Sequence, residues 1–157
     1  MHRVRERSMP RLAKIAAASA LALAPLAVPA AAPAVTNPYT AQQVCGPSYA
    51  LAQDIPLRSN NNAVLMGRLK LMYSLQTGRS CGVLLKVRQV GRPTFTSVSV
   101  AKQAKRPKWI DDGASFSYYA GPVFAHGTPA CVRIGGFMSV PGGREGLYVE
   151  PGWEGCP

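Results

Sequence analysis

The feature that most constrains this chain is an apolar leader followed by four widely spaced cysteines. Residues 1–34 begin with a positively charged stretch, continue through an Ala- and Leu-rich run and end in small residues. These are the three parts of a secretory signal peptide. The apolar run is shorter than the roughly 20 residues that a membrane-spanning helix needs. We therefore expect an exported chain without a membrane span, with residues 1–34 removed and residues 35–157 forming a single domain.

Removal of the leader changes the charge of the chain. Five of the 18 Lys and Arg residues and one of the seven Asp and Glu residues lie in the leader, so the net charge falls from +11 to +7. A positive charge of this size favours anionic partners such as wall polymers, and it is equally compatible with solubility alone. Because exported proteins do not normally meet nucleic acid, we expect no nucleic-acid partner.

The four cysteines, Cys45, Cys81, Cys131 and Cys156, all follow the leader. An even number of cysteines in an exported domain predicts two disulfides. A metal site is disfavoured, because no two cysteines have the short spacing of a zinc knuckle and residues 35–157 contain a single histidine. Three pairings are possible. We favour Cys45–Cys81 with Cys131–Cys156, since pairing between neighbours closes the shortest loops.

Alternating hydrophobicity predicts a β-hairpin in the first half of the domain. Apolar and polar residues alternate over residues 64–75, which is typical of a half-buried strand. Residues 76–80 contain a glycine and form a natural hairpin loop. In the following strand, the face that carries Cys81 is expected to point inward, and the opposite face, with Lys86, is expected to carry the polar side chains.

Short strands and turn residues continue along the rest of the domain. Further strands are expected at residues 49–53, 94–101, 109–110, 115–119, 123–125, 131–134, 137–140 and 147–149. Pro56 is expected to force a loop, residues 111–113 to form a second hairpin turn, and the pairs 121–122 and 135–136 to interrupt strands. No window shows a helical period with caps. The sequence therefore predicts an all-β fold, a small antiparallel β-sandwich or barrel.

The residues available for catalysis are few. A Ser-His-Asp arrangement would have to combine Ser115 or Ser117 with His126 and with Asp111 or Asp112. No Gly-x-Ser-x-Gly motif is present to expose a nucleophile, and neither a metalloprotease motif nor a phosphate-binding glycine loop occurs. We therefore expect a non-catalytic protein that holds no cofactor and no metal.

The densest run of positive charge is the best candidate for a binding site. It consists of Lys102, Lys105, Arg106 and Lys108, and it ends at Trp109. Basic residues beside an aromatic side chain can hold a polyanion, although a charge run is more often a solvated surface.

The aromatic residues suggest a second kind of binding surface. Trp109, Tyr118, Tyr119 and Trp153 could form a platform on which sugars stack, whereas aromatics at strand spacing more often belong to a core.

Several short segments, in order along the chain, resemble the spore-associated protein A family of filamentous actinomycetes. The matching pieces are Asn-Pro-Tyr-Thr at 37–40, Val-Cys-Gly at 44–46, Leu-Met-Tyr at 71–73, Tyr-Tyr-Ala-Gly-Pro-Val at 118–123 and Cys-Val at 131–132. The resemblance implies a small exported protein found with spores or aerial hyphae; it implies a location and no reaction. The tail at 141–155 departs from the family pattern.

Three functions remain open from the sequence. The first is a secreted, non-catalytic protein that associates with a polymer of the spore or cell surface. The second is a secreted inhibitor or interaction module that binds a protein partner, and the third is a small hydrolase. The oligomeric state is left open.

Overall fold

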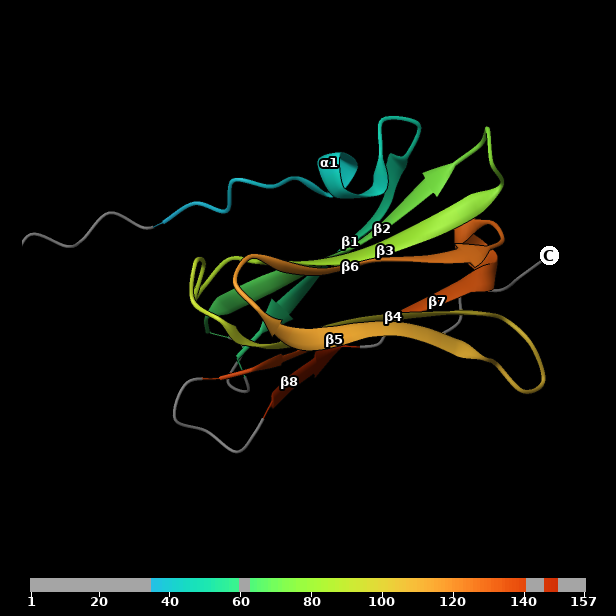
Figure 1. The fold of residues 1–157 in the computed structure, drawn as a ribbon. Coiled ribbons are helices and arrows are strands. Elements are labelled where there is room, and N and C mark those ends of the chain that lie inside the picture. The colour runs from blue at the N-terminus through green and yellow to red at the C-terminus, as the bar shows by residue number, and fades with distance from the viewer. Residues whose placement is uncertain (1–34, 60–62, 141–145, 150–157) are drawn as a thin grey trace, which may run out of the picture. The chain divides into compact units, whose positions relative to one another are not determined.

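The computed structural model describes residues 35–59, 63–140 and 146–149, and most of them lie in strands (Figure 1). In chain order the elements are α1 (Ala41–Cys45), β1 (Ala50–Arg58), β2 (Leu65–Ser74), β3 (Arg79–Lys86), β4 (Thr94–Lys102), β5 (Trp109–Phe116), β6 (Tyr119–His126), the 3-10 helix η1 (Pro129–Cys131), β7 (Val132–Ser139) and β8 (Gly146–Val149).

The strands form two four-stranded sheets that lie as two layers (Figure 1). The first sheet has the order β1-β2-β3-β6 and the second the order β5-β4-β7-β8. All neighbouring strands pair antiparallel. The prediction of an all-β antiparallel fold is confirmed. Of the two predicted architectures, sandwich and barrel, the structure has the sandwich.

The main hydrophobic core lies between the two sheets. Leu69, Leu71 and Leu84 from the first sheet meet Val98 and Val100 from the second, and none of these side chains has exposed surface. Burying a side chain of this size contributes about 1.5–3 kcal/mol. The contacts between these strands therefore hold the layers face to face.

A short helix covers the outer face of the first sheet. Ala41 and Cys45 of α1 pack against Met72, Cys81 and Val83 in a second buried cluster. Strand β3 is consequently buried on both of its faces. No helix in the described ranges combines the length and the apolar character needed to cross a membrane.

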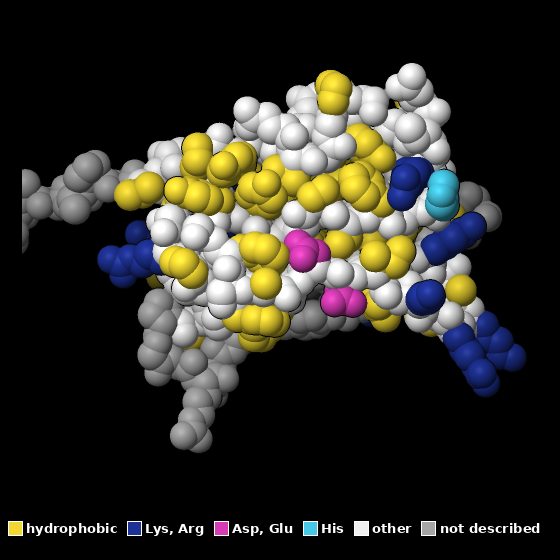
Figure 2. Space-filling view, in the orientation of Figure 1, with side chains coloured by type: hydrophobic (Ala, Val, Ile, Leu, Met, Phe, Trp, Pro, Cys, Tyr) yellow, Lys and Arg dark blue, Asp and Glu magenta, His cyan; other side chains and the backbone are white. Residues whose placement is uncertain are grey.

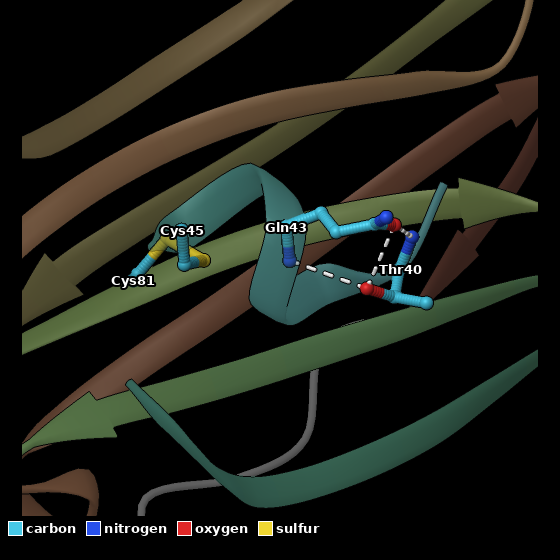
Figure 3. The surroundings of a disulfide bond; sticks show 4 residues. All are labelled: Thr40, Gln43, Cys45 and Cys81. Atoms are coloured by element: carbon cyan, nitrogen blue, oxygen red, sulfur yellow. Dashed lines mark hydrogen bonds between the residues drawn. A yellow bond between two sulfur atoms is a disulfide. The ribbon is translucent and has the colours of Figure 1, made fainter. Parts of the chain in front are cut away.

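The prediction that the domain contains no helix is wrong, because α1 is present. This helix is too short to produce a helical period in the sequence. Thr40 caps it: its Oγ1 accepts a hydrogen bond from Gln43 N at 3.2 Å, while Thr40 N donates to Gln43 Oε1 at 2.8 Å (Figure 3). Gly46 ends the helix with φ 110°, and its N–H donates to Gln42 O at 2.8 Å. The sequence signal for this helix is the capping box Thr-x-x-Gln.

The predicted pairing of Cys45 with Cys81 is confirmed. This disulfide joins α1 to β3 across a sequence separation of 36 residues (Figure 3). Cys156 lies outside the described residues, so the structure describes one disulfide, and the pairing of Cys131 with Cys156 stays a prediction.

The loop expected at Pro56 is wrong, because β1 runs through it. Pro56 pairs with Arg68 of β2, and β1 is the edge strand of its sheet. Proline lacks the N–H that a central strand must donate, but an edge strand can turn that position toward solvent.

The hairpin turn expected at residues 111–113 is also wrong. Strand β5 pairs with β4 along its whole length, from Trp109 to Phe116, and the chain reverses after Phe116, before β6. Asp112 has a different role, since its Oδ2 accepts a hydrogen bond from Gly121 N at 2.7 Å and so links β5 of the second sheet to β6 of the first.

The interruption expected at residues 121–122 is confirmed in part. Strand β6 runs through Gly121 and Pro122, but its register with β3 shifts there, because Gly82 pairs with Val123 and Leu84 with Ala120.

The interruption expected at residues 135–136 is wrong, since Gly136 lies inside β7 and pairs with β4 without a shift. A Cβ atom at Gly136 would lie 3.1 Å from Leu69 Cδ1 of the facing sheet. The missing side chain therefore leaves room for this leucine between the sheets.

Lys86 does not lie on a polar outer face as expected; its side chain has no exposed surface. Because α1 covers the Cys81 face of β3, the face that carries Lys86 turns toward the second sheet. Its Nζ donates to Arg92 O at 2.7 Å, to Thr94 Oγ1 at 2.6 Å and to Phe116 O at 3.0 Å. These bonds use all three donors of the ammonium group. Burial lowers the pKa of Lys86 below its ordinary value.

Candidate functional site

An open depression lies on the outer face of the second sheet. We call it the sheet groove; its volume is about 620 Å³, and it is lined by Phe95, Ser97, Ser99, Trp109, Asp111, Gly113 and Arg133. The pairing of β4 with β5 and β7 produces it. Ser99 stands opposite Asp111, and Ala101 stands between Trp109 and Arg133. Side chains that are distant in the sequence thus come to share one face.

Aromatic side chains stand toward both ends of the sheet groove. Trp109 is half-buried at one end. Phe95, which is 47% exposed, lies toward the other end with its ring 5.8 Å from that of Phe137. Phe95 is six residues from Ala101, the partner of Trp109, so the two ends are about 20 Å apart.

Between the aromatic side chains, the floor of the sheet groove is lined by small and polar residues. Ser97 and Ser99 supply hydroxyl groups, and Gly113 supplies no side chain. A Cβ atom at Gly113 would lie 2.9 Å from Ser97 Cβ, so a larger residue there would displace its neighbour. Asp111 adds an exposed carboxylate. The groove therefore offers hydrogen-bond donors and acceptors between two apolar ends.

The predicted polyanion site lies next to Trp109. We call Lys102, Lys105, Arg106 and Lys108 the basic loop; all four are exposed, at the end of β4 and in the connection to β5. Gln103 N donates to Cys131 O at 2.8 Å and fixes the base of this connection. Figure 2 shows Lys and Arg side chains gathered at the end of the sandwich where the connection projects. Within the described residues these four cations form no ion pair.

The structure separates Ser117 from His126. His126 is the last residue of β6, whereas Ser117 lies two residues before the first residue of that strand. The length of β6 separates them by about 23 Å. Asp112 is engaged with Gly121 N. The nearest partner of His126 in the register is Arg79 of β3, a cation that cannot act as its acid or base partner.

The predicted aromatic platform is divided between two places. Tyr118 and Tyr119 group with Tyr39, whose ring lies 5.4 Å and 5.0 Å from theirs. Tyr118 and Tyr119 follow the C-terminal end of β5, whereas Trp109 is the first residue of that strand. Trp153 lies outside the described residues.

A second, more apolar cavity of about 420 Å³ lies beside α1, with Tyr39, Leu51, Arg68 and Met72 among its lining residues. An ion-pair cluster adjoins it, in which Asp54 accepts hydrogen bonds from Arg68 Nε at 2.9 Å and Arg68 Nη2 at 2.6 Å, and from Lys70 Nζ. Asp54 therefore forms ion pairs with both Arg68 and Lys70 inside this cluster.

The pKa of Asp54 shows which interaction dominates in that cluster. Partial burial acts to raise the pKa, but the hydrogen bonds and positive charges of Arg68 and Lys70 together hold it below its ordinary value. The carboxylate therefore stays ionised, as expected for a structural ion pair. Among the described residues there is no group of three or more His, Cys, Asp or Glu side chains that could hold a metal.

Sequence reasoning found the basic loop and Trp109 but missed Phe95, Ser97, Ser99 and Arg133. Their signal is the alternation along β4, where the residues at 95, 97 and 99 share the face opposite the core. The partners that complete the groove come from β5 and β7, and they are defined only by the strand register.

The described residues form a disulfide-stapled β-sandwich with a basic loop at an end of β4 and a groove on the outer face of the second sheet. Over 128 residues the chain is 31% identical to Spore-associated protein A of Streptomyces coelicolor, which covers 80% of this chain and 78% of that protein. The chain therefore belongs to the spore-associated protein A family, as the resemblance indicated. No family model and no solved structure matches it.

Proposed function

We propose that this protein is exported and attaches, without catalysis, to a polyanionic polymer of the spore or cell surface through its basic loop. The observation that carries the proposal is the gathering of four exposed cations, unpaired within the described residues, on one connection between strands. Such a cluster attracts a polymer of repeated negative charge, and its contacts are weakened by salt.

Membership in the family supports the place of action. The relative is named for its association with spores, and a position on the spore or cell surface requires export. Residues 1–34 supply the features of a cleaved leader. Intact-mass measurement of the protein from culture medium tests this step, and a chain that retains residues 1–34 would contradict it.

The arrangement of the polar side chains supports a role without catalysis. Ser117 lies before the start of β6 and His126 lies at its end, and Asp54 is held in an ion-pair cluster. In the described part of the chain, these groups do not converge on one cleft. A hydrolase would need a nucleophile and a base within hydrogen-bond reach.

Retention on purified spores and cell walls over a salt gradient tests the attachment. We expect the wild-type protein to be held at low salt and released as salt rises. The double variant Lys105→Gln/Arg106→Gln should elute at lower salt.

The matched control is Arg88→Gln/Arg92→Gln, which removes the same charge from two exposed residues at another loop. This variant should elute with the wild type. The proposal fails if the wild type is not retained at any salt, or if both double variants shift equally.

A further inference from the structure

The sheet groove adjoins the basic loop but differs from it in chemistry. The basic loop contains only cations, whereas the lining of the sheet groove contains one carboxylate, Asp111, and one guanidinium, Arg133. These opposite charges give the lining no net charge, so it does not attract an anion as the basic loop does. The ligand suited to this groove therefore needs no net charge where it contacts the floor.

The aromatic ends select the shape of such a ligand. Trp109 and Phe95 present flat apolar surface about 20 Å apart along the sheet face. Hydroxyl groups of Ser97 and Ser99 lie between them, and each can both donate and accept a hydrogen bond. A ligand with apolar faces and polar edges, repeated along an extended chain, matches this order. A strand of linked pyranose rings has these properties, since its axial C–H groups stack on aromatic rings while its hydroxyls face polar side chains.

An extended peptide fits the sheet groove less well. A peptide binds a sheet by adding a strand at an edge, where free N–H and C=O groups are available. The sheet groove lies on a face, centred on β4, whose two sides are already paired with β5 and β7. Its contacts must therefore come from side chains, as is usual for sugar recognition.

We propose that the sheet groove binds a polysaccharide strand, with Trp109 as the principal stacking residue and Ser97, Ser99 and Asp111 bonding to its hydroxyls. This inference rests on the proposed surface attachment and names the polymer class, a polysaccharide whose anionic substituents reach the basic loop while its sugar rings occupy the groove. Attachment then has two components. Salt weakens the contacts of the basic loop, whereas it leaves the contacts of the sheet groove intact.

Retention at high salt separates the two parts. In about 1 M NaCl the Debye length is about 3 Å, so attraction by the exposed cations is largely screened. The probes are cellulose, chitin and purified peptidoglycan. We expect the wild-type protein to be retained on at least one of them at this salt. Trp109→Ala should weaken that binding about tenfold, whereas Trp109→Phe should preserve most of it.

Two further variants make the result independent of the folding of Trp109→Ala. Ser99→Leu fills the floor while leaving Trp109 in place, and it should also weaken binding. Tyr118→Ala, which removes an exposed aromatic outside the groove, should bind as the wild type does. Circular dichroism confirms the folding of each variant.

The outcomes distinguish this inference from the proposed function. Wild-type retention on spores at low salt, with no retention on any of the three polysaccharides at high salt, overturns the groove proposal and leaves the attachment proposal intact. Wild-type binding by folded Ser99→Leu and Trp109→Ala also overturns the groove proposal. High-salt retention that Lys105→Gln/Arg106→Gln does not change supports it.

Discussion

Lys86 donates a hydrogen bond to Thr94 Oγ1 over 2.6 Å, and this contact ties β3 of the first sheet to β4 of the second. The same Nζ also bonds to the carbonyl oxygens of Arg92 and Phe116. A single buried side chain thus connects the end of β3, the loop before β4 and the end of β5.

Truncation of this lysine should strongly destabilise the fold. Lys86→Ala removes a buried aliphatic stem and leaves three acceptors without their donor, so we expect a loss of about 3 kcal/mol or more in the free energy of unfolding. Urea unfolding followed by circular dichroism measures it. Lys105→Ala, at an exposed position, should change stability by no more than about 0.5 kcal/mol. Equal effects of the two variants would contradict a structural role for Lys86.

The lowered pKa of Lys86 predicts a pH dependence of stability. Burial places the folded-state pKa below the ordinary value of 10.5. Between these two values the unfolded chain binds more protons than the folded chain, so the free energy of unfolding rises with pH. Lys86→Met lacks the titrating group. The wild type should therefore gain stability relative to Lys86→Met as the pH rises from neutral toward 10.5, and parallel pH profiles would contradict this.

Some features of the fold follow from nearby residues and could be predicted from the sequence, whereas others depend on long-range contacts. The hairpin between β2 and β3 was predictable because Gly78, with φ 62°, marks a turn between two alternating segments. The position of Lys86 was not predictable from alternation, because alternation divides a strand into two faces without showing what covers each. Here α1 covers one face and the second sheet covers the other.

The candidate site likewise has one part that could be predicted from nearby residues and one part that could not. The basic loop is contiguous in sequence and could be found from composition. The sheet groove joins Ser99 with Asp111 and places Ala101 between Trp109 and Arg133, and these neighbours depend on the register of three strands. Pro56 is a similar case, since its tolerance depends on the position of β1 at the edge of the sheet. Long-range pairing decides both, and a single sequence contains no direct signal for it.

Removal of the disulfide should loosen α1 and lower the global stability. The bond between Cys45 and Cys81 closes a loop of 36 residues, which restricts the unfolded chain by about 4 kcal/mol. We expect Cys45→Ala/Cys81→Ala to lose about this amount in urea unfolding. Thr40→Ala, which removes the helix cap without cutting the cross-link, should lose about 1 kcal/mol. If both variants lost the same small amount, the disulfide would not be the main attachment of α1.

The ion-pair cluster of Asp54 should stabilise the fold at neutral pH and cease to do so in acid. Hydrogen bonds and positive charge from Arg68 and Lys70 hold the pKa of Asp54 below its ordinary value of 3.8. The folded chain therefore releases this proton more readily than the unfolded chain. The resulting stabilisation is present above pH 3.8 and is lost as the pH falls through the folded-state pKa.

The test compares Asp54→Asn with the wild type across the acid range. Because the side chains are partly exposed, we expect Asp54→Asn to cost at most about 1 kcal/mol at neutral pH. The difference from the wild type should shrink as the carboxylate becomes protonated. Asp111→Asn is the matched control, since Asp111 forms no ion pair within the described residues. A difference between Asp54→Asn and the wild type that stays constant down to the acid transition would show that the effect comes from the lost geometry of the carboxylate and not from its charge.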